Sequence, residues 1–327
     1  MELSTETKKE LFWMMLLARR LDERAWALYR EKKVTFHISG IGHEAAQVGA
    51  GFALRQGYDW VTPYYRDLSL LLVLDFSARD FMLNLMGKQE ALDSGGRQMP
   101  GNWSFRRSNI LSHSTPVATQ VLHAVGIGQA IKLKNEDKVV LASMGEGATS
   151  QGEWYEAVNW AAVHKLPVIF FVQNNRLAIS TRQEQQMAVE NVSEKAAGLG
   201  LPGVTVDGTD AVAVYRTVLG AVENARTGMG PSLVEAQVYR ITPHSSDDDD
   251  RSYRSREEVE VARHLDPLNK IRKELLYAGI LTEEQVDEME TEAELRVADA
   301  VLYAERAPNP SADEGLHPVY AEEVSHA

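Results

Sequence analysis

Two short, largely apolar segments lie on either side of one amphipathic segment in the middle of the chain. Residues 139–144 and 168–172 show no polar alternation, which is typical of strands covered on both faces of a sheet. The segment 153–165 between them is acidic at its start and basic at its end, and Pro167 follows it, as expected for a helix. A strand–helix–strand unit of this kind holds its two strands parallel and close together.

The rest of the chain predicts further elements of the same two kinds. Strands are expected at 204–206 and 233–239, with a helix at 211–226 between them. A long helix begins near Thr5 with an apolar stripe along one side, and the aperiodic segment 33–42 after it predicts a loop. Helix-start signals at Asp266 and Thr282 make the C-terminal region helical, to about Arg306.

These elements predict an α/β fold with a mostly parallel sheet and helices on both faces. An α/β domain that includes the N-terminal helix is expected over residues 1–265, and C-terminal helices with a polar tail over 266–327. The stripe on the first helix and the C-terminal helices are expected surfaces for a partner, although the C-terminal helices could instead pack on the core.

Composition excludes several classes of function. The chain has 47 acidic and 34 basic residues and a net charge of −13, which argues against binding to nucleic acid or to an anionic membrane. It has no cysteine, so a disulfide scaffold, a thiolate metal site and a cysteine nucleophile are excluded. With no membrane-length apolar run and no leader pattern, we expect a cytoplasmic protein, or a mature organellar one without its presequence (mitochondrial matrix in a eukaryote).

Glu146 and Asn175 carry the strongest chemical signal. Each follows one strand of the central unit, and ligands bind at that edge of an open α/β sheet. Carboxylate and amide oxygens suit Mg²⁺, and the glycines on either side of Glu146, followed by a helix start, suit a phosphate. Either motif alone is also a common turn signal, but their pairing on one unit indicates a site for Mg²⁺ and a diphosphate.

A nicotinamide-dependent oxidoreductase is disfavoured by the same glycines. Gly145 and Gly147 lack the third glycine of a dinucleotide-binding turn, and no acidic residue lies about 20 residues further on.

The segment 145–175 resembles the thiamine diphosphate motif, in which GDG or GEG precedes NN by some 25–30 residues. Further segments are similar to the alpha subunit of 2-oxo acid dehydrogenases, over roughly residues 5–305: 42–54, 64–67, 95–100, 114–120, 174–181 and 244–260. The resemblance is closest to branched-chain (2-oxoisovalerate) members. The segments QNNR and YRSREE also resemble bacterial pyruvate dehydrogenase alpha chains, which keeps that substrate open.

The resemblance implies a diphosphate-type thiamine diphosphate-binding fold and a set of site residues. Mg²⁺ would be held by Glu146, Asn175 and the backbone carbonyl of Leu177, where the family often has tyrosine. The implied cofactor-binding residues are Tyr65, Arg66, Thr115, Val117, Gly145, Glu146, Gly147, Ala148, Gln173, Asn175 and His244. A K⁺ site is implied at Ser114, Pro116, Thr119 and Gln120.

Some of these residues have alternative interpretations. Arg66 could form a surface ion pair with Asp59 or Asp67, and Ser114 or Thr115 could simply be a helix N-cap. Gln173 replaces an arginine of many branched-chain members, and Tyr64 stands where that subgroup often has glutamine.

The segment from His244 to Arg254 resembles the loop over the active site of the family. His244 would contact the cofactor phosphate and act in reductive acylation of the lipoyl group. We expect the aspartates 247–250 to be solvated, with Arg251 and Arg254 as counter-charges. Ser245 and Ser255 match serines that are phosphorylated in some eukaryotic relatives.

The implied activity is thiamine diphosphate-dependent oxidative decarboxylation of a branched-chain 2-oxo acid. The implied partners are a beta subunit, in an α2β2 heterotetramer, and a lipoyl-bearing acyltransferase component. A non-enzymatic diphosphate-binding module is the remaining alternative, and it would not need the loop that carries His244.

Overall fold

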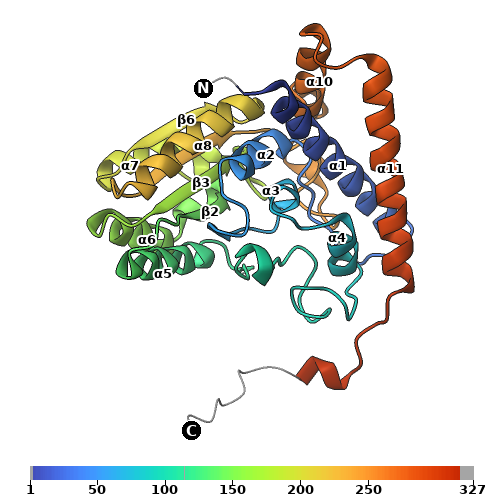
Figure 1. Ribbon diagram of the computed structural model, residues 1–327, viewed down its shortest axis with the longest axis horizontal. Coiled ribbons are helices and arrows are strands. Elements are labelled where there is room, and N and C mark those ends of the chain that lie inside the picture. Colours follow the sequence, from blue (N-terminus) through green and yellow to red (C-terminus); the bar gives the residue numbers. More distant parts are fainter. Residues whose placement is uncertain (1–2, 114, 317–327) are drawn as a thin grey trace.

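A five-stranded, wholly parallel sheet forms the centre of the protein (Figure 1). The computed structural model describes residues 3–113 and 115–316. The strand order is β1-β2-β3-β7-β6. The strands are β1 (Trp60–Thr62), β2 (Val140–Gly145), β3 (Val168–Asn174), β6 (Gly203–Asp207) and β7 (Ser232–Gln237), while β4 (Leu177–Ala178) and β5 (Thr181–Arg182) form a separate small hairpin.

Helices cover both faces of the sheet. The α-helices are α1 (Thr5–Arg30), α2 (Glu44–Phe52), α3 (Leu68–Val73), α4 (Ala78–Leu85), α5 (Thr119–Lys134), α6 (Gly152–Val163), α7 (Lys195–Gly198), α8 (Ala211–Arg226), α9 (Arg256–His264), α10 (Pro267–Tyr277) and α11 (Glu283–Arg306). Helices α5 and α6 lie on one face and α2 and α8 on the other (Figure 1). Among the described residues, no helix is both long and apolar enough to cross a bilayer.

Strand β3 shows why its sequence has no polar alternation. Ile169 and Phe171 belong to the core shared with α2 and α8, and Val168, Phe170 and Val172 belong to the core shared with α5 and α6. All five side chains are inaccessible to solvent. Burial on both faces removes the polar positions that a half-exposed strand would show.

The sequence-based prediction of the elements is confirmed with small shifts. The four strands that it expected occur, and their neighbours in the sheet are parallel. The predicted bounds of the helix at 211–226 match α8, and α1 begins after an N-cap at Ser4 rather than Thr5. Strand β1 was missed, because three residues are too short for a recognisable pattern and only pairing with β2 defines them.

The N-terminal and C-terminal helices pack against one another. Helix α1 contacts α10 and α11, and these helices lie side by side in Figure 1. Its predicted stripe, Leu17, Leu21, Ala25 and Leu28, is buried in this core together with apolar residues of α10 and α11. The expectation that this stripe contacts a partner is therefore wrong, since the protein's own helices cover it.

A buried ion cluster joins helices α1, α2 and α10. The Arg19 guanidinium donates from Nε to Glu44 Oε1 at 2.6 Å. Its two Nη atoms form a bidentate ion pair with the Asp266 carboxylate, each at 2.8 Å. Burial by itself lowers the pKa of Arg19. The two carboxylates, Glu44 and Asp266, raise it by more, so the pKa lies above its ordinary value. Asp266 also caps α10, so the cluster fixes α10 against α1 and α2.

Replacement of the cationic member should leave two carboxylates without a partner. We expect Arg19→Met to lower the free energy of unfolding by about 3 to 5 kcal/mol, the usual effect of breaking a buried ion pair. Urea titration followed by circular dichroism measures this loss. The control is Arg263→Met, which breaks the exposed pair with Glu260 and should cost less than about 1 kcal/mol. Equal losses in the two variants would contradict the prediction.

Candidate functional site

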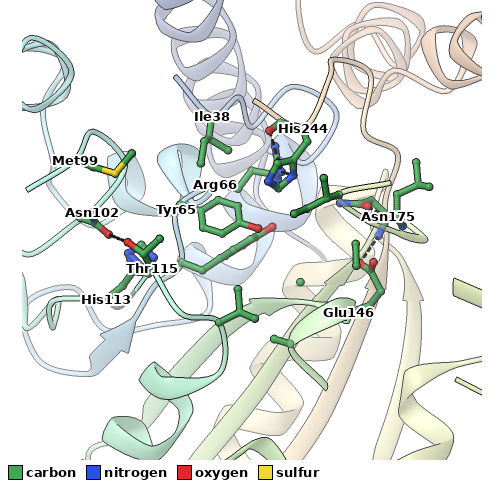
Figure 2. A pocket seen from close by; sticks show the side chains of 18 of the residues that line it. Ile38, Tyr65, Arg66, Met99, Asn102, His113, Thr115, Glu146, Asn175 and His244 are labelled. Atoms are coloured by element: carbon green, nitrogen blue, oxygen red, sulfur yellow. Dashed lines mark hydrogen bonds between the residues drawn. The ribbon is translucent and has the colours of Figure 1, made fainter. Parts of the chain in front are cut away.

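A pocket of about 430 Å³ opens at the carboxyl ends of β2 and β3 (Figure 2). The turn after β2 and the residue after β3 form one side of it, and the loops that carry Tyr65, Thr115 and His244 form the others. Most of the residues predicted from sequence line it: Tyr65, Arg66, Thr115, Val117, Gly145, Glu146, Gly147, Ala148, Asn175, Leu177 and His244. The fold thus brings together predicted residues as far apart in the sequence as Tyr65 and His244.

The Glu146 carboxylate is buried at the end of β2. Its Oε2 atom accepts a hydrogen bond from the Asn175 backbone N–H at 3.4 Å, while Oε1 has no partner. Burial raises the pKa of Glu146, although the backbone N–H groups of Glu146 and Asn175 and the Gln186 side chain lower it. A buried carboxylate oxygen without a partner is costly, so a cation at this position would supply what the protein itself does not.

The donor atoms around Glu146 fit Mg²⁺. Within residues 3–113 and 115–316, no three His, Asp or Glu side chains lie close enough to hold a metal, so a ligand set here must include amide and carbonyl oxygens. Asn175 Oδ1 accepts a hydrogen bond from the Leu177 backbone N–H at 3.1 Å, and Leu177, whose carbonyl accepts from Arg240 at 3.3 Å, lines the same pocket. Three hard oxygen donors leave places for phosphate oxygens and water, which Mg²⁺ usually retains.

The turn after β2 is pressed against the hairpin formed by β4 and β5. A Cβ atom on Gly147 would lie 2.7 Å from Cβ of Ala178, closer than carbon atoms approach. Glycine is therefore required for the Glu146–Ser150 turn to pack there. Helix α6 begins directly afterwards at Gly152, so its N-terminal end lies behind the turn, where backbone N–H groups favour an anion.

Two buried guanidinium groups lie close to the same space. Arg66 donates to the Ser39 carbonyl and its Nη2 lies 3.4 Å from His244 Nδ1. Arg240 donates to the carbonyls of Leu177 at 3.3 Å and Ile179 at 2.9 Å. Burial, and next the neighbouring Arg66, lower the pKa of Arg240 to about 10. Two neighbouring cations favour a polyanionic ligand, and the planar guanidinium group suits phosphate oxygens.

The alternative of a surface ion pair for Arg66 is wrong. Its side chain is buried, and neither aspartate considered for it is its partner. Asp59 pairs with Arg226 at 2.8 Å. Asp67 accepts hydrogen bonds from the Tyr64 N–H at 2.9 Å and from Gln173 Nε2 at 2.6 Å.

His244 lies at the mouth of the pocket beside Tyr65, with ring centroids 5.9 Å apart in an edge-on arrangement. Burial, followed by Arg66 and Arg240, lowers the pKa of His244 to about 3. The imidazole is therefore neutral near pH 7, and one ring nitrogen is available to accept a proton or hydrogen bond.

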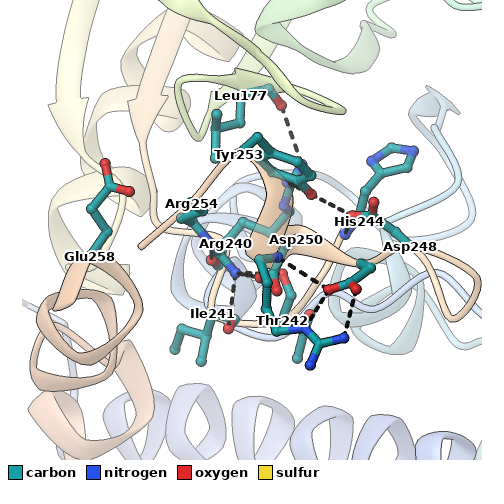
Figure 3. A network of polar contacts seen from close by, with 12 residues as sticks. Leu177, Arg240, Ile241, Thr242, His244, Asp248, Asp250, Tyr253, Arg254 and Glu258 are labelled. Atoms are coloured by element: carbon teal, nitrogen blue, oxygen red, sulfur yellow. Dashed lines mark hydrogen bonds and ion pairs between the residues drawn. The ribbon is translucent and has the colours of Figure 1, made fainter. Parts of the chain in front are cut away.

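The loop that carries His244 is held by its own side chains (Figure 3). Asp248 accepts hydrogen bonds from the His244 N–H at 2.8 Å and from the Tyr253 hydroxyl. Asp250 pairs with Arg254, which also donates to the Arg240 carbonyl. Only Asp249 forms an exposed pair, with Arg251 at 2.7 Å. The prediction of a solvated aspartate run is thus wrong for Asp248 and Asp250, which build the loop.

The structure does not bring every predicted residue to the pocket. Gln173 is fully buried behind it, bonded to other side chains, and does not line it. Thr119 donates to Glu153 at 2.8 Å, and Gln120 donates to the Ser143 carbonyl at 3.1 Å. Pro116 is exposed, and Ser114 lies outside the described residues.

The helix after this segment has no side-chain cap of the kind considered from the sequence. The N-cap of α5 is Ala118, with a φ of 79° and no capping hydrogen bond. Thr115 instead donates to Asn102 Oδ1 at 3.3 Å. The N-cap interpretation of Thr115 is therefore wrong.

Sequence reasoning missed several lining residues, most of them in aperiodic loops: Phe36, Ile38, Met99, Pro100, Asn102, His113, Gln151, Ala178 and Ile179. His113 is buried with no partner on either ring nitrogen, and burial lowers its pKa to about 4. His113 directly precedes segment 114–120, which is similar to the alpha subunits, but a single histidine outside any motif does not indicate a site residue.

Comparison with known proteins agrees with this geometry. Residues 13–313 match the family model described as "Dehydrogenase E1 component". The chain is 47% identical to the 2-oxoisovalerate dehydrogenase subunit alpha of Bacillus subtilis (strain 168), covering 98% of this chain and 97% of that one. It is 39% identical to the 3-methyl-2-oxobutanoate dehydrogenase subunit alpha of Mycobacterium tuberculosis (98% and 84%), and 34% identical to the pyruvate dehydrogenase E1 component subunit alpha of Mycoplasma genitalium (91% and 80%). The chain belongs to the thiamine diphosphate-dependent dehydrogenase E1 component family.

Proposed function

We propose that this chain is the alpha subunit of a branched-chain 2-oxo acid dehydrogenase. It would act on 2-oxoisovalerate (3-methyl-2-oxobutanoate) and related acids, as the names of the relatives that are 47% and 39% identical state for those proteins. The pyruvate dehydrogenase alpha subunit is the alternative, and it rests on a relative that is 34% identical.

One observation carries the proposal: the buried Glu146 carboxylate with an unpartnered Oε1 atom, facing Asn175 across the ends of β2 and β3 (Figure 2). With the Leu177 carbonyl, these residues would hold Mg²⁺. Arg66, Tyr65 and the backbone at Gly147 and Ala148 would then bind the diphosphate of the cofactor.

The chain's own residues would bind, orient and transfer protons. Bound thiamine diphosphate supplies the group that takes up the electrons released when the 2-oxo acid loses CO2. Thr115 lines the pocket on the side away from Glu146 (Figure 2), and Val117 lines it too. Both would orient the organic part of the cofactor. The neutral imidazole of His244, at the pocket mouth, is placed to exchange a proton during transfer to a lipoyl group.

The proposal includes partners and an environment. A beta subunit would complete the site in an α2β2 assembly, and an acyltransferase component would bring the lipoyl group. Apolar side chains exposed on α5 and α6 support a covering subunit, among them Leu133 (73% exposed), Trp160 (53%) and Val163 (67%). We also propose a cytoplasmic location, a boundary between units near residue 265, and K⁺ near Thr119 and Gln120, where Gln120 Oε1 is buried without a partner.

Reconstitution tests the assignment. This chain, its beta subunit and their mixture are assayed with saturating thiamine diphosphate and Mg²⁺, with 2-oxoisovalerate and pyruvate compared in parallel. We expect that only the mixture decarboxylates either substrate, and that its kcat/KM is higher for 2-oxoisovalerate than for pyruvate. Full activity of the single chain would contradict the subunit assignment, and a preference for pyruvate would establish the alternative substrate.

Glu146→Gln should separate stability from cofactor binding. In the assembled protein without Mg²⁺, we expect a free energy of unfolding about 1 to 2 kcal/mol higher, because a neutral amide costs less to bury than a carboxylate. Calorimetry should at the same time show loss of Mg²⁺-dependent thiamine diphosphate binding. Glu223→Gln, exposed on α8 and on the other face of the sheet from α5 and α6, is the control and should change neither. Wild-type cofactor affinity in Glu146→Gln would contradict the metal assignment.

His244→Ala should impair acyl transfer more than cofactor binding. The residue lies on the 244–255 loop and not on the β2–α6–β3 unit, so its loss leaves the metal donors in place. We expect acylation of the lipoyl group to fall by about 10²-fold or more, as when an acid–base group is removed. Decarboxylation measured with an artificial electron acceptor should fall less. Glu257→Gln, exposed on α9, is the control. Equal loss of both activities and of cofactor affinity would identify His244 as structural.

A further inference from the structure

A buried network behind the pocket has only one possible hydrogen-bond polarity, and Gln47 sets it. Its Nε2 lies 2.9 Å from the Arg66 backbone carbonyl, and its Oε1 lies 3.0 Å from the Ser69 backbone N–H. A carbonyl only accepts and an N–H only donates, so the Gln47 amide can be oriented in one way only. The second N–H of the Gln47 amide therefore points to Gln173, whose Oε1 lies 3.0 Å from Gln47 Nε2.

The hydrogen bonds made by the amide nitrogen of Gln173 are consistent with the same orientation. Its Nε2 donates to Asp67 Oδ1 at 2.6 Å and to Ser143 Oγ at 2.9 Å. Both hydrogens of the amide nitrogen are thus used, and Oε1 is left as an acceptor. This oxygen lies 3.0 Å from Nδ1 of His43 as well as from Gln47.

His43 must therefore carry its hydrogen on Nδ1. The ring is inaccessible to solvent, and the Asn175 side-chain nitrogen opposite its Nε2 can only donate, because the Asn175 oxygen accepts from the Leu177 N–H at 3.1 Å. In a neutral imidazole protonated at Nδ1, Nε2 is an acceptor. That atom lies 3.4 Å from the side-chain nitrogen of Asn175.

The orientation of the Asn175 amide follows. Two contacts set it: the Leu177 N–H donates to its oxygen at 3.1 Å, and its nitrogen faces His43 Nε2 at 3.4 Å on the other side. The reversed amide would present two N–H groups to a cation and repel it. His43 is also the N-cap residue of α2 but makes no capping hydrogen bond, so its side chain does not serve the helix.

We propose that His43 is a positioning residue, which together with the Leu177 N–H holds the Asn175 amide with its oxygen towards the divalent cation. This inference rests on the proposed function, because it takes Asn175 to be a metal ligand. His43 touches neither metal nor cofactor, and acts through Asn175 in the way that outer hydrogen-bond partners orient the ligands of other metal sites.

Two amide variants of the assembled αβ protein test the proposal. A glutamine side chain at position 43 reaches the place of Nε2 and can accept from Asn175, whereas an asparagine reaches only the place of Nδ1. The Mg²⁺ dissociation constant is measured by calorimetry at saturating thiamine diphosphate. We expect His43→Asn to weaken Mg²⁺ binding by about 10- to 100-fold, the usual effect of removing an orienting partner. His43→Gln should retain most of the affinity.

Controls separate positioning from packing. His264→Asn, exposed on α9, should leave Mg²⁺ affinity unchanged. The melting temperature of each metal-free assembly is also recorded. Equal weakening in His43→Gln and His43→Asn, with equal loss of melting temperature, would show a packing role and overturn the proposal.

Failure of the inference can be told from failure of the proposed function. If Glu146→Gln abolishes Mg²⁺ binding while both His43 variants bind it normally, the metal site stands and the positioning role is overturned. If Glu146→Gln itself binds Mg²⁺ with wild-type affinity, the metal site is misassigned, and the positioning role is overturned with it.

Discussion

The parallel register between β2 and β3 is the constraint on which the rest of the site depends. Gly145 pairs with Gln173, so the residues just beyond the two strands emerge side by side at one edge. A slip of one residue would reverse the faces of β3 and move its alternating apolar side chains between the two cores. Because both cores are fully packed, the hydrophobic register also fixes the position of Glu146 relative to Asn175.

Electrostatics then acts on a geometry that packing has set. Arg66 and Arg240 are buried beside the pocket. Asp248 and Asp250, near Arg240, bind other groups of the 244–255 loop (Figure 3), and Asp67, next to Arg66, binds Tyr64 and Gln173. Among its described residues, the protein therefore keeps two cations without a carboxylate partner beside the cavity, together with the unpartnered Oε1 of Glu146. Such an arrangement costs stability without a ligand and favours one that carries both a divalent cation and phosphate charge.

The sequence predicted the parts of this molecule that follow from local pattern. Double burial of β3 and the caps at Asp266 and Thr282 are visible in the residue types themselves. Resemblance to a family placed His244 and Thr115, which no periodicity could have brought together. Strand β1, the loop residues Phe36 and His113, and the withdrawal of Gln173 behind the pocket depend on contacts between distant segments. Those contacts have no signature in a single sequence.

The sharing of β3 between two cores has a consequence for local unfolding. Its amide hydrogens, bonded to β2 on one side and β7 on the other, exchange with solvent only when both cores open, which amounts to global unfolding. Asn175 follows the last residue of that strand, so it is attached to the most protected backbone in the protein. The 244–255 loop contributes no side chain to either core and is held by polar contacts, among them those to Tyr29 and His37, so its opening requires less free energy than global unfolding. The 244–255 loop can therefore open and close many times while Glu146 and Asn175, just beyond the ends of β2 and β3, stay in place.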